Sequence, residues 1–234
     1  MSERRIKEEI DSGTAPTRRL VDALDAIPIF PLPQVVLFPH AVLPLHVFEP
    51  RYRAMLQDCL ASHGALVIAQ LLAGEDEHGR PRIAPIAGGG IVVEHQPLAD
   101  GRSNIVVRGQ ARLLLEEHEP EDPARRPYRI ARATVLDDLP HPVAEHDRTA
   151  LAAAATMFAG EVKRHDPTFT FALPQTNDAG ELADLCAYQL VIDASSRQAV
   201  LEERDPRVRV EMVLNHLALQ HGAMMKTDGD RVLN

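Results

Sequence analysis

Residues 27–56 read IPIFPLPQVVLFPHAVLPLHVFEPRYRAML, and this stretch decides the fold class of the amino-terminal half. Six prolines fall within residues 27–50, among β-branched and aromatic side chains. Proline has no backbone N–H and interrupts helices, so the pattern predicts short extended strands separated by turns. After residue 49 the spacing of the apolar residues becomes that of a helix.

This helix is expected to begin at Pro50, because proline suits the first helical position and Glu49 lies at the favourable positive end of the helix. One apolar stripe follows at helical spacing, made of Tyr52, Met55, Leu56, Cys59 and Leu60. Gly64 can end the helix in the left-handed conformation.

Four further extended segments are expected in the first half, at residues 65–72, 82–96, 103–118 and 128–136, and the second of them is one strand or two. The three consecutive glycines at residues 88–90 predict a kink or bulge in the second of these. Asp100-Gly101 predicts a hairpin turn between the second and the third. Residues 1–26 are polar and show no clear period, which is typical of a loose arm or a short helix.

The second half has the pattern of helices. Residues 143–164 are rich in alanine, and residues 181–193 carry apolar residues at helical spacing. Ser195 and Gln198 match a capping box for a short helix. Another helix should follow Asp205-Pro206 and close at Gly222. Strands first and helices afterwards predict the α+β class.

The segments PIFPL (28–32), VLFP (36–39) and LPLHVFEPRY (43–52) resemble, in order, the opening of the Lon protease N-terminal, substrate-binding domain family. The run VRGQAR, which begins at residue 107, and the tail DPRVRVEMVLNHL, which begins at residue 205, are similar to later parts of the same family. The resemblance covers residues 27–221.

The resemblance implies a PUA-like β-pseudobarrel followed by a C-terminal helical bundle. We expect four parts: an arm (1–26), the pseudobarrel (27–140), the bundle (141–222) and a tail (223–234). The glycine run at residues 88–90 departs from the family, which normally has a less flexible strand there.

The ATPase and protease modules of Lon proteases leave no trace in this sequence. A phosphate loop needs a Gly-Lys pair, and none occurs. A Ser–Lys protease needs a lysine in a desolvated pocket. The three lysines, Lys7, Lys163 and Lys226, lie in the arm, at a helix end and in the polar tail. We therefore expect a stand-alone, ATP-independent recognition domain that is not an enzyme.

Composition limits the partners and the compartment. The net charge is −9, and residues 137–234, with 9 basic against 16 acidic residues, contribute most of it. Such acidity argues against broad binding to nucleic acid. Two cysteines on apolar stretches indicate buried thiols in a reducing compartment. Without a membrane span or a signal peptide in the sequence, we expect a cytoplasmic protein.

No constellation of catalytic, cofactor or metal-binding residues is expected. His141 and His146 are five residues apart, whereas a helical metal pair needs four. Neighbouring acidic residues do not converge on one point. Cys59 and Cys186 lie on apolar stripes and are expected in the core.

One cluster is ambiguous: Phe48, Glu49, Arg51 and Tyr52. On a structural interpretation, Tyr52 is a core residue and Glu49 with Arg51 fixes the corner between strand and helix. On a functional interpretation, Phe48 and its neighbours line a groove for exposed apolar polypeptide, because charge-rimmed apolar concavities are typical of such recognition.

Three functions follow from these observations. The first is a non-enzymatic domain that binds exposed apolar polypeptide, as a decoy or as an adaptor for a protease. The second is an RNA-binding PUA-like module, favoured by seven arginines within residues 102–132 but accompanied by no ladder of aromatic residues. The third is an uncharacterised enzyme that binds a small molecule.

Overall fold

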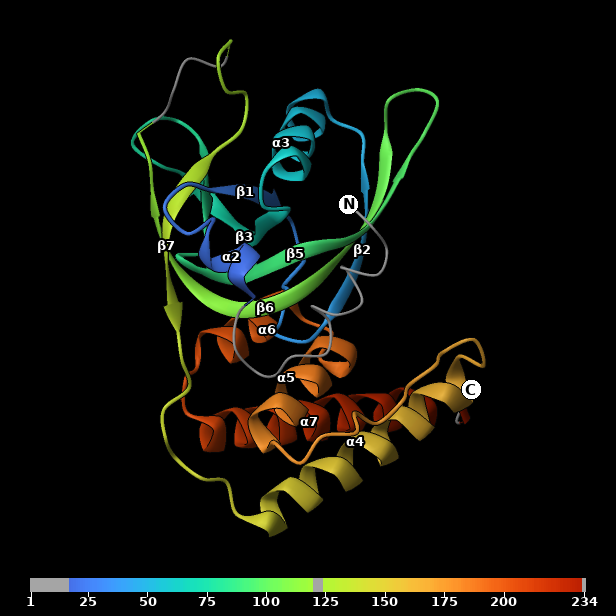
Figure 1. Ribbon diagram of the computed structural model, residues 1–234. Coiled ribbons are helices and arrows are strands. Elements are labelled where there is room, and N and C mark those ends of the chain that lie inside the picture. The colour runs from blue at the N-terminus through green and yellow to red at the C-terminus, as the bar shows by residue number, and fades with distance from the viewer. Residues whose placement is uncertain (1–16, 120–123, 233–234) are drawn as a thin grey trace. The chain divides into compact units, whose positions relative to one another are not determined.

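The computed structural model of the protein describes residues 17–119 and 124–232. The chain divides after Asp137 into a strand-rich unit and a helical unit (Figure 1). Strands come first and helices afterwards, so the predicted α+β class is confirmed.

A closed ring of strands forms the first unit. Its strands are β1 (Ile27–Leu32), β2 (Val42–Val47), β3 (Ala65–Glu75), β4 (Pro81–Ile83), β5 (Ile86–Pro97), β6 (Ser103–Glu117) and β7 (Ile130–Leu136). They pair in the order β1-β7-β6-β5-β3, and β1 then pairs with β3 in parallel, which closes the ring. β2 adds to β6, and β4 adds to β3. Closure satisfies most strand edges internally.

The interior of the ring is filled by small and branched side chains from alternate strand positions. Ile29, Val67, Ile91 and Leu113 belong to this cluster and are almost fully buried. Helix α2 (Arg18–Val21) adds Leu20 to the same cluster, so the short helix, one of the two expected alternatives for residues 1–26, is present at residues 18–21. Residues 1–16 of the expected arm lie outside the described residues.

The glycines in β5 and β6 let the segment before β2 cross the ring closely. Gly109 donates a hydrogen bond to the carbonyl of Ala41 (2.9 Å) and accepts one from the backbone N–H of His40 (3.0 Å). A Cβ atom on Gly109 would collide with the carbonyl oxygen of Phe38, and one on Gly88 with that of Leu37. The expected bulge is confirmed, because the register shifts between Gly89 and Gly90.

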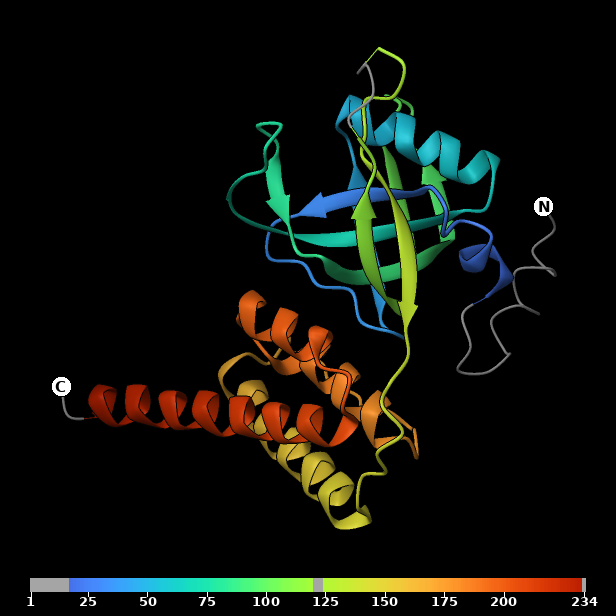
Figure 2. The same cartoon turned by 90° about the vertical axis from the view of Figure 1, so that its left-hand side faces the viewer.

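Helix α3 (Pro50–Ala61) packs on the outer face of β1 and β3 (Figure 2). Glu49 precedes its first turn and Pro50 opens it, as predicted. Four of the five stripe residues are buried, from Tyr52 to Cys59. Leu60, the fifth residue of the stripe, lies in the last turn of the helix and is 38% exposed.

The second unit consists of α4 (Glu145–His165), α5 (Ala179–Leu190), α6 (Ala194–Glu202) and α7 (Pro206–Val232). Helix α7 contacts the three others. The expected end at Gly222 is wrong, since α7 continues to Val232. The expected cap of α6 is also wrong: Asp193, not Ser195, accepts the hydrogen bond of the Ser196 N–H at 2.7 Å. Both residue types cap helices, and the sequence alone did not separate them.

A buried arginine joins the parts of this unit. Arg209 of α7 is fully buried. Its Nε lies 3.1 Å from Asp184 of α5, and its two terminal nitrogens donate to Asp138 at 2.7 and 2.5 Å. These ion pairs hold the segment after β7 and two helices together.

Candidate functional site

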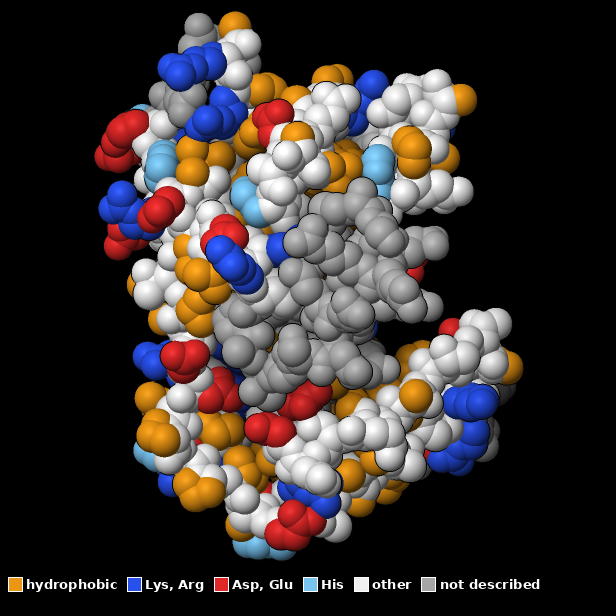
Figure 3. All heavy atoms as spheres, viewed as in Figure 1, with side chains coloured by type: hydrophobic (Ala, Val, Ile, Leu, Met, Phe, Trp, Pro, Cys, Tyr) orange, Lys and Arg blue, Asp and Glu red, His pale blue; other side chains and the backbone are white. Residues whose placement is uncertain are grey.

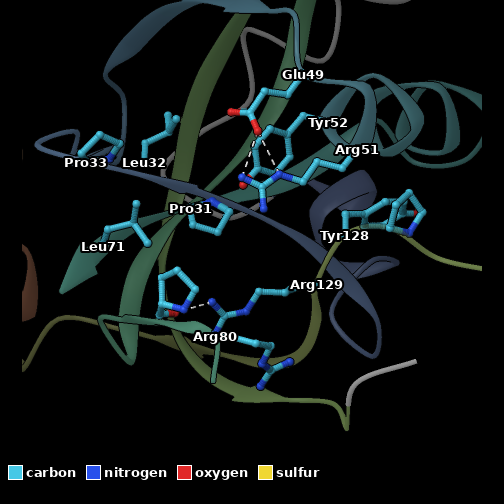
Figure 4. A pocket seen from close by; sticks show the side chains of 12 residues that line it. Pro31, Leu32, Pro33, Glu49, Arg51, Tyr52, Leu71, Arg80, Tyr128 and Arg129 are labelled. Atoms are coloured by element: carbon cyan, nitrogen blue, oxygen red, sulfur yellow. Dashed lines mark hydrogen bonds and ion pairs between the residues drawn. The ribbon is translucent and has the colours of Figure 1, made fainter. Parts of the chain in front are cut away.

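A cleft of about 310 Å³ lies in the first unit, between the end of β1 and the segment that leads into β7 (Figure 4). Most of its wall is apolar, formed by Pro31, Leu32, Pro33, Leu71, Pro81 and Pro127. Tyr52 and Tyr128 line it as well. Three arginines and one glutamate complete the lining.

The cleft opens where the pairing of β1 with β7 stops. Ile27 and Pro28 pair with Ala131 and Ile130, and the Ile29 N–H still donates to the Arg129 carbonyl at 2.9 Å. In an antiparallel ladder the next hydrogen-bonded pair comes two residues further along. That pair would join Pro31 to Pro127, and neither residue has an N–H to donate. The two segments therefore become opposite walls.

One wall is built around Tyr52. Its ring packs on Phe30 of β1, with 4.4 Å between the ring centroids. The guanidinium of Arg51 lies over the same ring, 4.5 Å from its centroid. Arg51 also donates from Nε to Glu49 at 3.0 Å. Burial raises the pKa of Tyr52, which keeps the phenol neutral near pH 7.

The facing wall carries Arg80 and Arg129, each held by carboxylates. Arg129 donates to both oxygens of Glu117, and to the carbonyl of Pro81 at 2.7 Å. Arg80 donates from Nε to Asp76 at 2.7 Å and lies 3.5 Å from Glu117. Such charge-assisted bonds give these side chains a fixed geometry.

Tyr128 is held in place by α3. Its hydroxyl donates to Asp58 at 2.5 Å. Burial, together with this bond to Asp58, raises the pKa of Tyr128 well above its usual value. The phenol is thus a fixed, neutral part of the cleft and not a proton donor for chemistry near pH 7.

Three of the four residues singled out in the sequence, Glu49, Arg51 and Tyr52, line this cleft. Phe48 does not. It is 58% exposed and stacks on His46 of β2 at a centroid distance of 6.1 Å. Sequence reasoning missed the facing wall, formed by Arg80, Tyr128 and Arg129, because those residues are far from α3 in the chain. No local sequence pattern marked this wall, because the register of β1 against β7 brings it to the cleft.

His46 lines a second hollow, of about 590 Å³, on the outer face of β2, β6 and β5. Its polar side chains already bond to one another. His46 Nδ1 lies 2.8 Å from Asn104 Oδ1, and Asn104 donates to Gln96 at 3.3 Å.

The remaining candidates have local roles. His141 lies 2.7 Å from Asp205, the carboxylate that also accepts the Arg207 N–H at the start of α7. Burial raises the pKa of both Cys59 and Cys186 to about 12, so neither thiol is an activated nucleophile. Within residues 17–119 and 124–232, no group of three His, Cys, Asp or Glu residues is arranged to hold a metal.

Three of the seven arginines within residues 102–132 are buried or already paired with a carboxylate. Arg112 is buried, Arg129 is paired with Glu117, and Arg102 is paired with Asp100 at 2.6 Å. On the face drawn in Figure 3, basic and acidic side chains are interspersed over the described atoms. A phosphate backbone would have to displace existing ion pairs to use them.

The family model of the ATP-dependent protease La (LON) substrate-binding domain matches residues 26–218. The chain belongs to this family. Lon N-terminal domains of known structure share its fold. One is a Lon N-terminal domain protein from Xanthomonas campestris, with a TM-score of 0.59, 20% identity, and coverage of 81% of this chain and 97% of that one. Another is the N-terminal domain of Mycobacterium avium complex Lon protease, with a TM-score of 0.61, 16% identity, and coverage of 83% and 98%.

Curated relatives carry this domain within a longer chain. The Lon protease of Geobacter metallireducens is 26% identical over 200 residues, which cover 84% of this chain and 24% of the relative. The Lon protease of Roseiflexus castenholzii is 30% identical over 213 residues, which cover 88% and 25%. This chain thus spans about a quarter of the length of these relatives.

No described helix is long and apolar enough to cross a membrane.

Proposed function

We propose that this chain is a recognition domain that binds exposed apolar segments of polypeptides in the cleft between Tyr52 and Tyr128. The observation that carries the proposal is the cleft itself, with apolar walls from β1, β3 and the segment before β7, and paired charges at its rim. A concave apolar site with a few placed polar groups is the usual form of a binding site. The family to which the chain belongs is named for substrate binding.

The cleft is suited to binding the side chains of a polypeptide and not to pairing with its backbone as an added strand. Sheet extension needs alternating N–H donors and carbonyl acceptors along an open edge. Pro31, Pro33 and Pro127 supply carbonyls but no N–H groups to the two walls. A bound segment would therefore be held mainly by burying its apolar side chains, which contributes about 25 cal/mol per Å² of apolar area removed from water.

Recognition without catalysis fits the chemistry of the cleft. Each arginine of the cleft is held in an ion pair: Arg51 with Glu49 of the lining, and Arg129 and Arg80 with Glu117 and Asp76 outside it. A general base would need a titratable group within reach of a substrate proton and with a pKa near the working pH. We also propose that the chain acts as an adaptor beside a protease. Its proposed location is the cytoplasm, because two buried free thiols are typical of a reducing compartment.

The test is a matched pair of substitutions on β3. Leu71 lines the cleft, whereas the next residue, Leu72, is 37% exposed and outside the lining. Fluorescence anisotropy would measure the Kd of a short labelled peptide with a central Leu-Phe-Val-Leu run. We expect Leu71→Gln to weaken binding by about tenfold, since burial of a leucine is worth about 1.5–3 kcal/mol. Leu72→Gln should bind like the unmodified protein. Equal binding by both variants, or no binding by the unmodified protein, would overturn the proposal.

A further inference from the structure

Positively charged side chains outnumber negatively charged ones in the lining of the cleft. Arg51, Arg80 and Arg129 are all part of its lining, whereas Glu49 is the only carboxylate among the lining residues of the described chain. Glu117 and Asp76, which pair with Arg129 and Arg80, are not among the lining residues. A ligand in the cleft therefore meets more guanidinium than carboxylate.

Arg51 is the most available of the three arginines. Its side chain is 54% exposed, against 14% for Arg129 and 23% for Arg80. Arg51 Nε and Nη2 both bind the same oxygen of Glu49, at 3.0 and 2.9 Å. Within the described residues, its Nη1 group has no hydrogen-bond partner. Figure 4 shows this guanidinium at the Glu49 side of the cleft, across from Arg129.

The pair of Arg51 with Glu49 is easily exchanged. Both side chains are partly exposed, and such surface ion pairs contribute between 0 and about 1 kcal/mol. The Arg51 guanidinium carbon also lies over the Tyr52 ring, 4.5 Å from its centroid, which restricts the positions of this guanidinium. A planar guanidinium is the group that binds a carboxylate through two parallel hydrogen bonds.

We propose that Arg51 determines specificity, by selecting apolar polypeptide segments that carry an acidic side chain next to the residue buried in the cleft. This inference rests on the proposed function. Glu49 is the internal competitor: it occupies Arg51 while the cleft is empty and gives way to the carboxylate of the ligand. Arg80 and Arg129 stay with their own partners and add a favourable field.

The experiment compares three labelled peptides that share a Leu-Phe-Val-Leu centre, flanked on both sides by Glu, Gln or Lys. The peptides are acetylated and amidated, so no terminal carboxylate is present. The readout is the ratio of the Kd for the Gln peptide to that for the Glu peptide. We expect the unmodified protein to prefer the Glu peptide about fivefold, which corresponds to the upper range of one ion pair.

Two variants and one control separate the roles. Arg51→Gln should bring the ratio to about one, and Glu49→Gln should raise it about threefold by removing the competitor. Arg53→Gln, on the same helix but outside the cleft lining, should leave the ratio unchanged. Equal affinity for the Glu and Gln peptides would overturn this inference while the proposed function stands. Tightest binding of the Lys peptide would overturn it as well, and binding of none of the peptides would overturn both proposals.

Discussion

Glu117 of β6 accepts hydrogen bonds from two nitrogens of Arg129, at 2.7 Å from Nε and 2.5 Å from Nη2. This bidentate pair fixes one wall of the cleft, because Arg129 also holds the carbonyl of Pro81. Glu117→Gln should lower the free energy of unfolding by about 1.5–3 kcal/mol, the usual worth of hydrogen bonds to a charged group. Urea unfolding followed by circular dichroism measures this loss. Glu116→Gln, the exposed neighbour, should change it by less than about 0.5 kcal/mol, and equal effects would contradict the assigned role.

The segment before β2 passes close to Gly109, so an alanine at this position should lower the stability of the protein. An alanine at Gly160 should raise it and serves as the control. A Cβ at Gly109 meets the carbonyl oxygen of Phe38, so Gly109→Ala should destabilise the first unit by about 1–3 kcal/mol or more. Gly160 of α4 has no atom within 4 Å of an added Cβ. Gly160→Ala should therefore stabilise its helix by up to about 1 kcal/mol. Thermal unfolding of the two variants would contradict the account if both shifted in the same direction.

The buried Arg209 is expected to dominate the stability of the helical unit. Arg209→Met leaves Asp184, which is almost fully buried, without its cation. Removing one partner of a buried pair typically costs about 3–5 kcal/mol. Arg207→Met on the same helix, where the arginine is half exposed, should cost less than about 1 kcal/mol. Helix content followed during urea unfolding distinguishes them, and adding Asp184→Asn to Arg209→Met should recover part of the loss.

Acid should loosen the turn that presents Arg80 to the cleft. Burial pushes the pKa of Asp76 upward, but hydrogen bonds from Arg80 and His78 outweigh it and lower this pKa to about 2, from an ordinary 3.8. A carboxylate with a lowered folded-state pKa stabilises the protein above the unfolded pKa and loses that contribution as pH falls. The window here is pH 4 to 2.

Asp76→Asn should therefore be destabilised near neutral pH and should lose less stability than the unmodified protein between pH 4 and 2. Urea midpoints at several pH values give both slopes. The exposed Glu77 in the same turn provides the control Glu77→Gln. Parallel pH curves for the Asp76→Asn variant and the unmodified protein would exclude Asp76 as the source of this acid sensitivity.

The fold was predictable where local rules are strong. Prolines specify extended backbone, and the spacing from Tyr52 to Cys59 specifies a helix with one buried face. The bulge at Gly89 and Gly90 followed from the absence of side chains. Helix ends were less predictable, because Gly222 lies on an exposed part of α7, where a glycine weakens a helix without ending it.

One wall of the cleft was predictable from the sequence, and the other was not. Glu49, Arg51 and Tyr52 are neighbours at one corner, so a local pattern placed them together. The other wall depends on the register of β1 against β7, because Tyr128 and Arg129 come directly before β7 and reach the cleft where this pairing stops. Register arises from pairing over a separation of about a hundred residues, and no local pattern encodes it.

Photo-crosslinking tests the central claim, that polypeptide is bound in this cleft, most directly. The Leu-Phe-Val-Leu peptide would carry a benzophenone side chain in place of its phenylalanine, and mass spectrometry would locate the adducts on the full chain. We predict adducts confined to residues 31–33, 49–52, 71, 80–81 and 127–129, suppressed by Leu71→Gln and retained by Leu72→Gln. Adducts concentrated on the helical unit or on the hollow beside His46, with none in the cleft, would contradict it.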